Sequence, residues 1–115
     1  MESKKCKFSY GEIDDSLIVS CKGDDENVKE RFNLGNFIFS LTGRGKIVGV
    51  QILNVSDVLV DYNLDPNMLN ELRNIDLIVV KKEGLLGVAL ILDFRNQKGK
   101  ISIPLMNLSK QIAIR

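Results

Sequence analysis

The stretch Asn36-Phe-Ile-Phe-Ser-Leu-Thr-Gly-Arg-Gly-Lys-Ile-Val-Gly-Val50 decides the fold class. Phe37, Phe39 and Leu41 alternate with mostly polar neighbours, and this period of two predicts a half-buried β-strand. Gly43-Arg-Gly45 follows, and glycine supplies the positive φ angle that a tight hairpin turn needs. The stretch therefore predicts a β-hairpin.

The rest of the chain has the same character. It contains 12 Ile and 10 Val but only 2 Ala, and β-branched side chains favour a pleated sheet over a helix. Short alternating segments between turn residues predict an antiparallel meander of about five strands, followed by three to four more strands in the second half. A short helix is expected near residues 66–73, because Asp65 can cap it and Pro66 fits its first position. We therefore predict a mainly β protein with one or two short helices.

The chain length and an internal similarity bear on its organisation. The 115 residues are sufficient for one domain, 1–115. Gly45–Ser56 aligns with Gly99–Ser109 if one residue is deleted at Gly49, and an extra glycine in a strand is typical of a β-bulge. This similarity predicts repeat halves at 5–60 and 75–115 that form a sandwich or barrel-like core. The alternative is that hairpins of similar composition look alike.

Composition excludes several classes of function. Histidine is absent, which excludes Ser-His-Asp triads and histidine-ligated metal sites. The net charge of +1 argues against a surface devoted to nucleic acid or membrane. The N-terminus has no apolar segment behind its charges, so a cytoplasmic protein without a signal peptide is expected. No cofactor is predicted.

The two cysteines are predicted to be cross-strand neighbours. A turn in the middle of the Gly11–Asp15 loop places Phe8 opposite Val19 and Cys6 opposite Cys21. The pair is either a disulfide or two small buried thiols, which pack as hydrophobic residues. The cytosol of a mesophile keeps thiols reduced, whereas intracellular proteins of hyperthermophiles are an exception.

Charged residues suggest two further kinds of site. The acidic run Asp24-Asp25-Glu26 is a weak candidate for a hard cation, because its spacing is not that of a calcium loop and a solvated loop explains it better. The loop around Gly43 lacks the spacing of a phosphate-binding P-loop and is better explained as a hairpin turn. Nucleic-acid binding is disfavoured by the scarcity of aromatic residues near the C-terminal basic residues. Five basic side chains remain candidates for contact with an anion: Arg44, Lys46, Arg95, Lys98 and Lys100.

The strand predicted over residues 86–94 is apolar on both faces. Such a strand is normally covered on both sides, and the two predicted halves offer too little surface to cover it. We therefore expect a homodimer in which a second copy buries the remaining apolar side chains. The predicted interface residues are Leu86, Val88, Leu90, Ile91, Leu92 and Phe94.

Two segments resemble a known family. Tyr10 with Asp14-Asp-Ser-Leu-Ile-Val19 resembles the opening hairpin "Y-D-x-x-x-D-x-L-Y-I" of the domain-of-unknown-function family 2283. Gly45–Ser56 is similar to the second signature of that family, "G-x-[IV]-V-G-[IV]-E-I-L-x-A-S", although Gln51 stands where the family has Glu. The resemblance covers residues 8–56. It implies a small β-rich fold and carries over no catalytic residue.

The sequence thus favours a non-enzymatic protein-interaction module that self-associates. One alternative is a regulatory, antitoxin-like module that binds a partner protein or nucleic acid. Another is an enzyme that acts through carboxylates, which the missing histidine and the weak acidic clusters disfavour.

Overall fold

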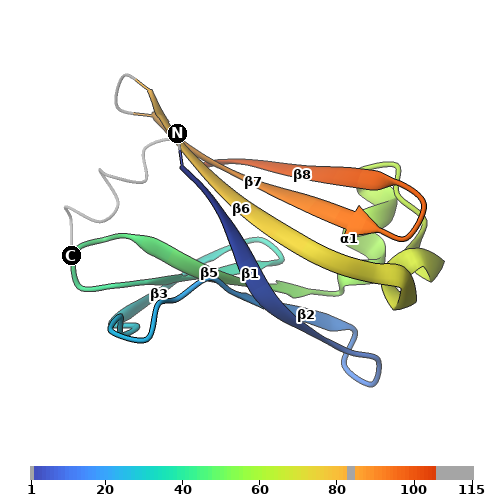
Figure 1. Ribbon diagram of the computed structural model, residues 1–115, viewed down its shortest axis with the longest axis horizontal. Coiled ribbons are helices and arrows are strands. Elements are labelled where there is room, and N and C mark those ends of the chain that lie inside the picture. The colour runs from blue at the N-terminus through green and yellow to red at the C-terminus, as the bar shows by residue number, and fades with distance from the viewer. Residues whose placement is uncertain (1, 83–84, 106–115) are drawn as a thin grey trace.

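The computed structural model describes residues 2–82 and 85–105 of the chain. Eight antiparallel strands form one sheet that curls into a half-barrel, with two short helices at one end (Figure 1). The prediction of a mainly β protein is confirmed. The elements are β1 Glu2–Gly11, β2 Ser16–Ser20, β3 Glu30–Leu34, β4 Phe37–Leu41, β5 Ile47–Leu53, α1 Val55–Asp61, the 3₁₀ helix η1 Pro66–Glu71, β6 Leu72–Lys82, β7 Leu85–Phe94 and β8 Lys98–Leu105.

The strand order is β3-β4-β5-β2-β1-β6-β7-β8. The first half has five strands and the second has three, as predicted, but the first half is not a simple meander. Strand β5 lies between β4 and β2, so the long connection from Ser20 to Glu30 passes over two positions in the sheet. Turn residues mark where strands end and not which strands pair, which is why the sequence did not reveal this order.

Strand β1 joins the two halves. Its residues Lys7–Gly11 pair with β2, and Glu2–Cys6 pair with β6. The predicted register is confirmed, with Phe8 opposite Val19. Cys6, at the point where β1 changes partner, forms a disulfide with Cys21 across a Cα–Cα distance of 4.4 Å. The bridge therefore ties the end of β2 to the strand that connects both halves.

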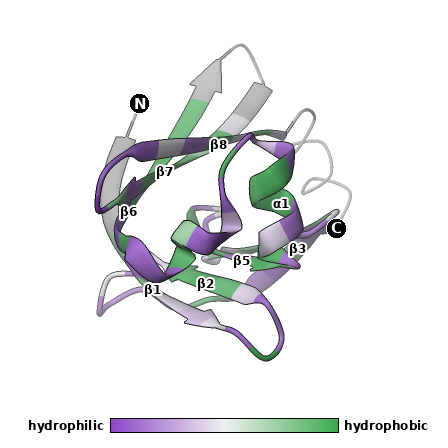
Figure 2. Cartoon of the chain, turned by 90° about the vertical axis from the view of Figure 1, so that its right-hand side faces the viewer, coloured by the Kyte–Doolittle hydropathy of each residue, from purple (hydrophilic) through white to green (hydrophobic). Residues whose placement is uncertain are grey.

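The core lies on the inner face of the curled sheet. Figure 2 shows α1 in the mouth of the half-barrel, between the sheet edges β3 and β8. Tyr62, just after α1, donates a hydrogen bond from its hydroxyl to the Ser102 carbonyl of β8 at 2.9 Å. The largest fully buried side chains come from both halves of the sheet and from α1: Phe39, Leu17, Leu41, Ile52, Leu59, Ile75, Leu90, Leu92 and Ile101.

This core corrects the predicted dimer interface. The curl of the sheet turns one face of β7 toward the other half of the same chain. Four of the predicted interface residues are consequently buried inside the core and unavailable to a partner: Val88, Leu90, Leu92 and Phe94. Ile91 lies on the opposite, outer face and is half-buried. The side chain of Leu86 lies outside the described residues.

Helix α1 was not foreseen, whereas η1 was. The β-branched residues that follow β5 hide α1 in the sequence, and its N-cap residue Asn54 has φ 52° and makes no capping bond with its side chain. At η1, Asp65 Oδ1 accepts a hydrogen bond from the Asn67 backbone N–H at 2.9 Å, as predicted for a cap. The helix ends sooner than predicted, because β6 begins at Leu72.

The predicted β-bulge is present, but one residue before the predicted position at Gly49. Gly49 pairs with Ser40 and Ile47 pairs with Leu41, so Val48 is the extra residue. A Cβ atom on Gly49 would lie 2.9 Å from the Val19 carbonyl oxygen, which explains the glycine. The internal repeat stays a prediction. Within the described residues, the helices are too short to form an apolar membrane span.

Candidate interaction surface

The outer face of the sheet carries two rows of side chains across the first half. The first row, which we call the apolar row after its two isoleucines, consists of Ile18 and Ile38 with the polar Gln51 between them, in directly paired positions of β2, β4 and β5. The second, which we call the small row, consists of Ser20, Gly49 and Ser40, in the next outward-facing positions of the same strands. Because the second row has almost no side-chain volume, it forms a trough beside the first.

This trough is a groove of about 270 Å³, which we call the outer groove. Its wall on one side is the apolar row, in which Ile18 is 49% exposed. Its other lining includes Val28 and the exposed cations Lys22 and Arg31. Lys7, exposed on β1, pairs with Ser20 and adds a third cation beside the groove. The described residues that line the groove include hydroxyls and cations but no carboxylate.

A second apolar region lies on the outer face of β6 and β7. Ile78 pairs with Ala89, and Ile91 pairs with Asp76. These isoleucines are half-buried, and Val80 on the same face is 40% exposed. One carboxylate oxygen of Asp76, Oδ1, is buried without a hydrogen-bond partner among the described residues.

The β1–β2 hairpin ends in an acidic tip, Glu12-Ile13-Asp14. All three residues are exposed, and Ile13 is fully so. The next residue, Asp15, turns inward with φ 50°. Asp15 Oδ1 accepts hydrogen bonds from the Ser56 hydroxyl at 2.8 Å and from the Tyr10 hydroxyl at 3.2 Å. Asp15 therefore fixes the base of the tip, and Ile13 lies at its exposed end.

The Tyr10–Asp15–Ser56 cluster is best explained as a helix cap. Asp15 Oδ2 accepts a hydrogen bond from the Ser56 backbone N–H at 3.2 Å, which satisfies a free donor in the first turn of α1. Partial burial raises the pKa of Tyr10, and its hydrogen bond to Asp15 raises it further. Among the described residues, the Asp15 carboxylate accepts three hydrogen bonds, two of them from Ser56, and the chain has no histidine to act as the base, so the cluster is a poor nucleophilic site.

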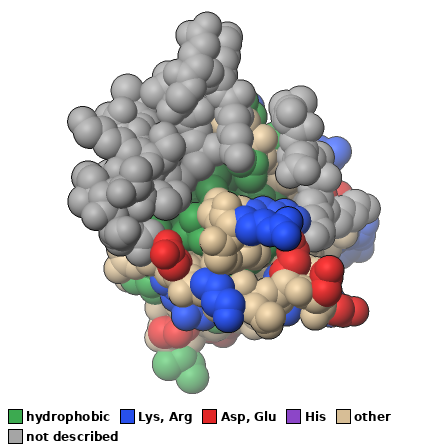
Figure 3. All heavy atoms as spheres, turned by 90° about the vertical axis from the view of Figure 1, so that its left-hand side faces the viewer, with side chains coloured by type: hydrophobic (Ala, Val, Ile, Leu, Met, Phe, Trp, Pro, Cys, Tyr) green, Lys and Arg blue, Asp and Glu red, His purple; other side chains and the backbone are tan. Residues whose placement is uncertain are grey.

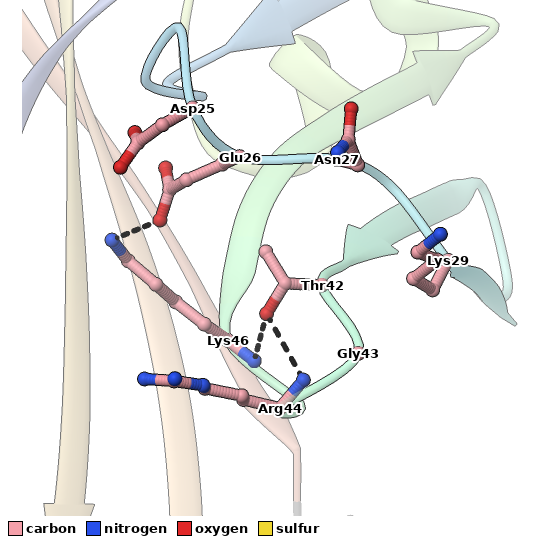
Figure 4. A pocket seen from close by; sticks show the side chains of 8 residues that line it. All are labelled: Asp25, Glu26, Asn27, Lys29, Thr42, Gly43, Arg44 and Lys46. Carbon is pink, nitrogen blue, oxygen red and sulfur yellow. Dashed lines mark hydrogen bonds and ion pairs between the residues drawn. The ribbon is translucent and has the colours of Figure 1, made fainter.

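The predicted acidic candidates do not gather around a common point. Asp24 and Asp25 are exposed, while Glu26 accepts a hydrogen bond from the Gly23 backbone N–H at 2.8 Å. Glu26 also forms an ion pair of 2.6 Å with Lys46, visible in Figure 4. Among the described residues, no group of acidic or cysteine side chains has the arrangement needed for a metal ion.

The five predicted anion contacts fall into two separate groups. Arg44 and Lys46 lie in the β4–β5 hairpin, and Arg95, Lys98 and Lys100 lie in and after the β7–β8 hairpin, at the other end of the long axis (Figure 1). At the first end, basic and acidic side chains are interspersed (Figure 3). Figure 4 shows Arg44 and Lys46 on the same side as Asp25 and Glu26. These residues therefore form no continuous basic surface.

The basic group beside the outer groove was missed in the sequence. The register of the first hairpin, which the sequence predicts, places Lys7 opposite Ser20, which is close to Lys22 in the chain. Arg31 joins them only through the strand order.

Comparison of the chain with protein-family models, curated proteins and solved structures finds no match. The resemblance to the domain-of-unknown-function family 2283 therefore stays a prediction. Tyr10, Asp15 and Ser56, which stand at polar positions of its two signatures, meet in one hydrogen-bonded cluster.

Proposed function

We propose that the protein is a non-enzymatic interaction module that self-associates. The observation that carries the proposal is the exposure of isoleucine on the outer face of a sheet whose core is already formed by its inner face. Ile18 is 49% exposed, whereas its neighbours Leu17 and Val19 are almost completely buried. Apolar side chains arranged in a patch with a polar rim are typical of a protein–protein interface.

Self-association is favoured over capture of an unrelated protein because the surface is self-complementary in charge. The outer groove is basic, and the β1–β2 hairpin tip of the same chain is acidic. The antitoxin-like alternative has one observation in its favour, since cations and serine hydroxyls beside the groove are also suitable phosphate contacts. The antitoxin-like alternative is therefore tested in the same experiment as self-association.

The experiment is size-exclusion chromatography with light scattering, over a series of concentrations, on the full chain. We expect the molar mass to rise from that of a monomer toward that of a dimer. A monomer mass at every concentration would overturn the proposal. A parallel series with a short duplex oligonucleotide tests the alternative, and co-elution that abolishes the dimer would favour nucleic-acid binding instead.

A cytoplasmic location remains part of the proposal. The disulfide between Cys6 and Cys21 is unusual for the cytosol of a mesophile and is compatible with an intracellular protein of a hyperthermophile. Thiol labelling of protein isolated under denaturing, alkylating conditions would report which form the cell maintains.

A further inference from the structure

We infer that the outer groove of one copy binds the acidic hairpin tip of a second copy, reciprocally, about a two-fold axis at β2. This inference rests on the proposed function and names the surfaces that perform it. The occupant is a second copy of this chain, and the contact consists of Glu12-Ile13-Asp14 of each copy against the groove of the other.

The tip has the properties of an inserting element. Ile13 is fully exposed at its apex, and burying an isoleucine side chain at an interface is favourable. Glu12 and Asp14 flank it with exposed carboxylates. Asp15 anchors the base of the tip to Ser56, so little loop ordering opposes binding.

The groove has the complementary properties. Its lining offers Val28 to an aliphatic side chain, and its volume of about 270 Å³ exceeds that of one isoleucine. Lys22 lies across the small row from Ile18, two positions beyond Ser20, and Arg31 extends that row beside its partner Ser40. Both cations can pair with carboxylates there. Ser20 and Ser40 add hydroxyl donors to the floor.

The order of these residues along the hairpin explains the two-fold symmetry. The acidic tip precedes β2, the basic Lys22 follows it, and Ile18 lies midway between them. When two copies of β2 stack in antiparallel directions, Ile18 meets Ile18 of the second copy and each acidic tip lies over the basic end of the other strand. A two-fold contact of this kind closes the assembly at a dimer.

The test is a charge exchange in the full chain. One variant carries Glu12→Lys and Asp14→Lys, and the other carries Lys22→Glu and Arg31→Glu. Each variant alone opposes like charges at both contacts, so its dimer should dissociate at least about tenfold more readily than that of the wild type. An equimolar mixture restores opposite charges at both contacts, and sedimentation velocity should show a heterodimer with near wild-type affinity. Failure to fold cannot explain this recovery.

Four results would decide against the inference. A wild-type dimer that neither variant weakens would overturn it and leave the proposed function intact. The inference would also be overturned, and the proposed function left intact, if Ile91→Lys on the outer face of β7 dissociates the dimer while the charge variants do not. Dissociation of both variants without recovery on mixing would also overturn it, whereas a wild-type monomer at every concentration would overturn the proposed function as well.

Discussion

The carboxylate of Asp15 accepts a hydrogen bond of 2.8 Å from the hydroxyl of Ser56, 41 residues further along the chain. This bond fixes the β1–β2 hairpin to the first turn of α1. Because Asp15 is turned inward, the three residues before it project from the surface. The same contact thus positions a structural helix and presents the acidic tip.

Loss of this bond should weaken the fold. Ser56→Ala removes the hydroxyl donor and should lower the free energy of unfolding by about 0.5–1.5 kcal/mol in urea denaturation. The control is Ser9→Ala, an exposed serine on β1, which should change stability by less than about 0.5 kcal/mol. Equal stability of both variants would contradict a stabilising role for the Ser56 hydroxyl bond.

The disulfide should contribute substantially to stability. It closes a loop with a sequence separation of 15, for which chain entropy predicts about 2–4 kcal/mol. Urea denaturation with and without a reductant should therefore show a large difference for the wild type. The double variant Cys6→Ala/Cys21→Ala should be insensitive to the reductant, and an equal response from both proteins would refute the assignment.

The phenol of Tyr10 should titrate above its ordinary value. Burial and the bond to Asp15 raise its pKa above 10.0, and absorbance at 295 nm in Tyr62→Phe, where Tyr10 is the remaining tyrosine, reports it. A raised pKa means that the folded state favours the protonated phenol. Its contribution to stability is therefore full below pH 10 and is lost as pH rises through the higher, folded-state pKa. A midpoint at or below 10.0 would contradict this environment.

Substitution of two adjacent residues of β7 should destabilise the fold to different degrees. Leu90 is completely buried, so Leu90→Ala should lower the free energy of unfolding by about 2–5 kcal/mol. Ile91 is half-buried on the outer face, and Ile91→Ala should cost less than about 1.5 kcal/mol. Chemical denaturation of both variants at the same protein concentration measures the two losses in the free energy of unfolding. A larger loss at Ile91 would restore the original interface prediction.

Local features of this fold could be predicted from the sequence. Alternation and turn residues located the strands, and the register of the first hairpin placed Cys6 beside Cys21. These features depend on neighbours in the chain.

Features that depend on strand order could not be predicted. The position of β5 between β4 and β2 arises from pairing across a long connection. The outer groove brings Lys22 and Arg31 together only after that pairing. The inward face of β7 likewise follows from the curl of the whole sheet, so the apolar strand was misassigned to an interface between copies.

The most direct measurement of the central claim is cross-linking at the two-fold axis. Ile18→Cys places a thiol where two copies are expected to meet, and a short bismaleimide should convert it to a covalent dimer at micromolar concentration. The matched control is Val80→Cys on β6, in the second half of the sheet, where Val80 is exposed to a similar extent, 40%. This variant should remain monomeric on a denaturing gel. Equal cross-linking of both variants, or preferential cross-linking of Val80→Cys, would contradict a dimer formed through β2.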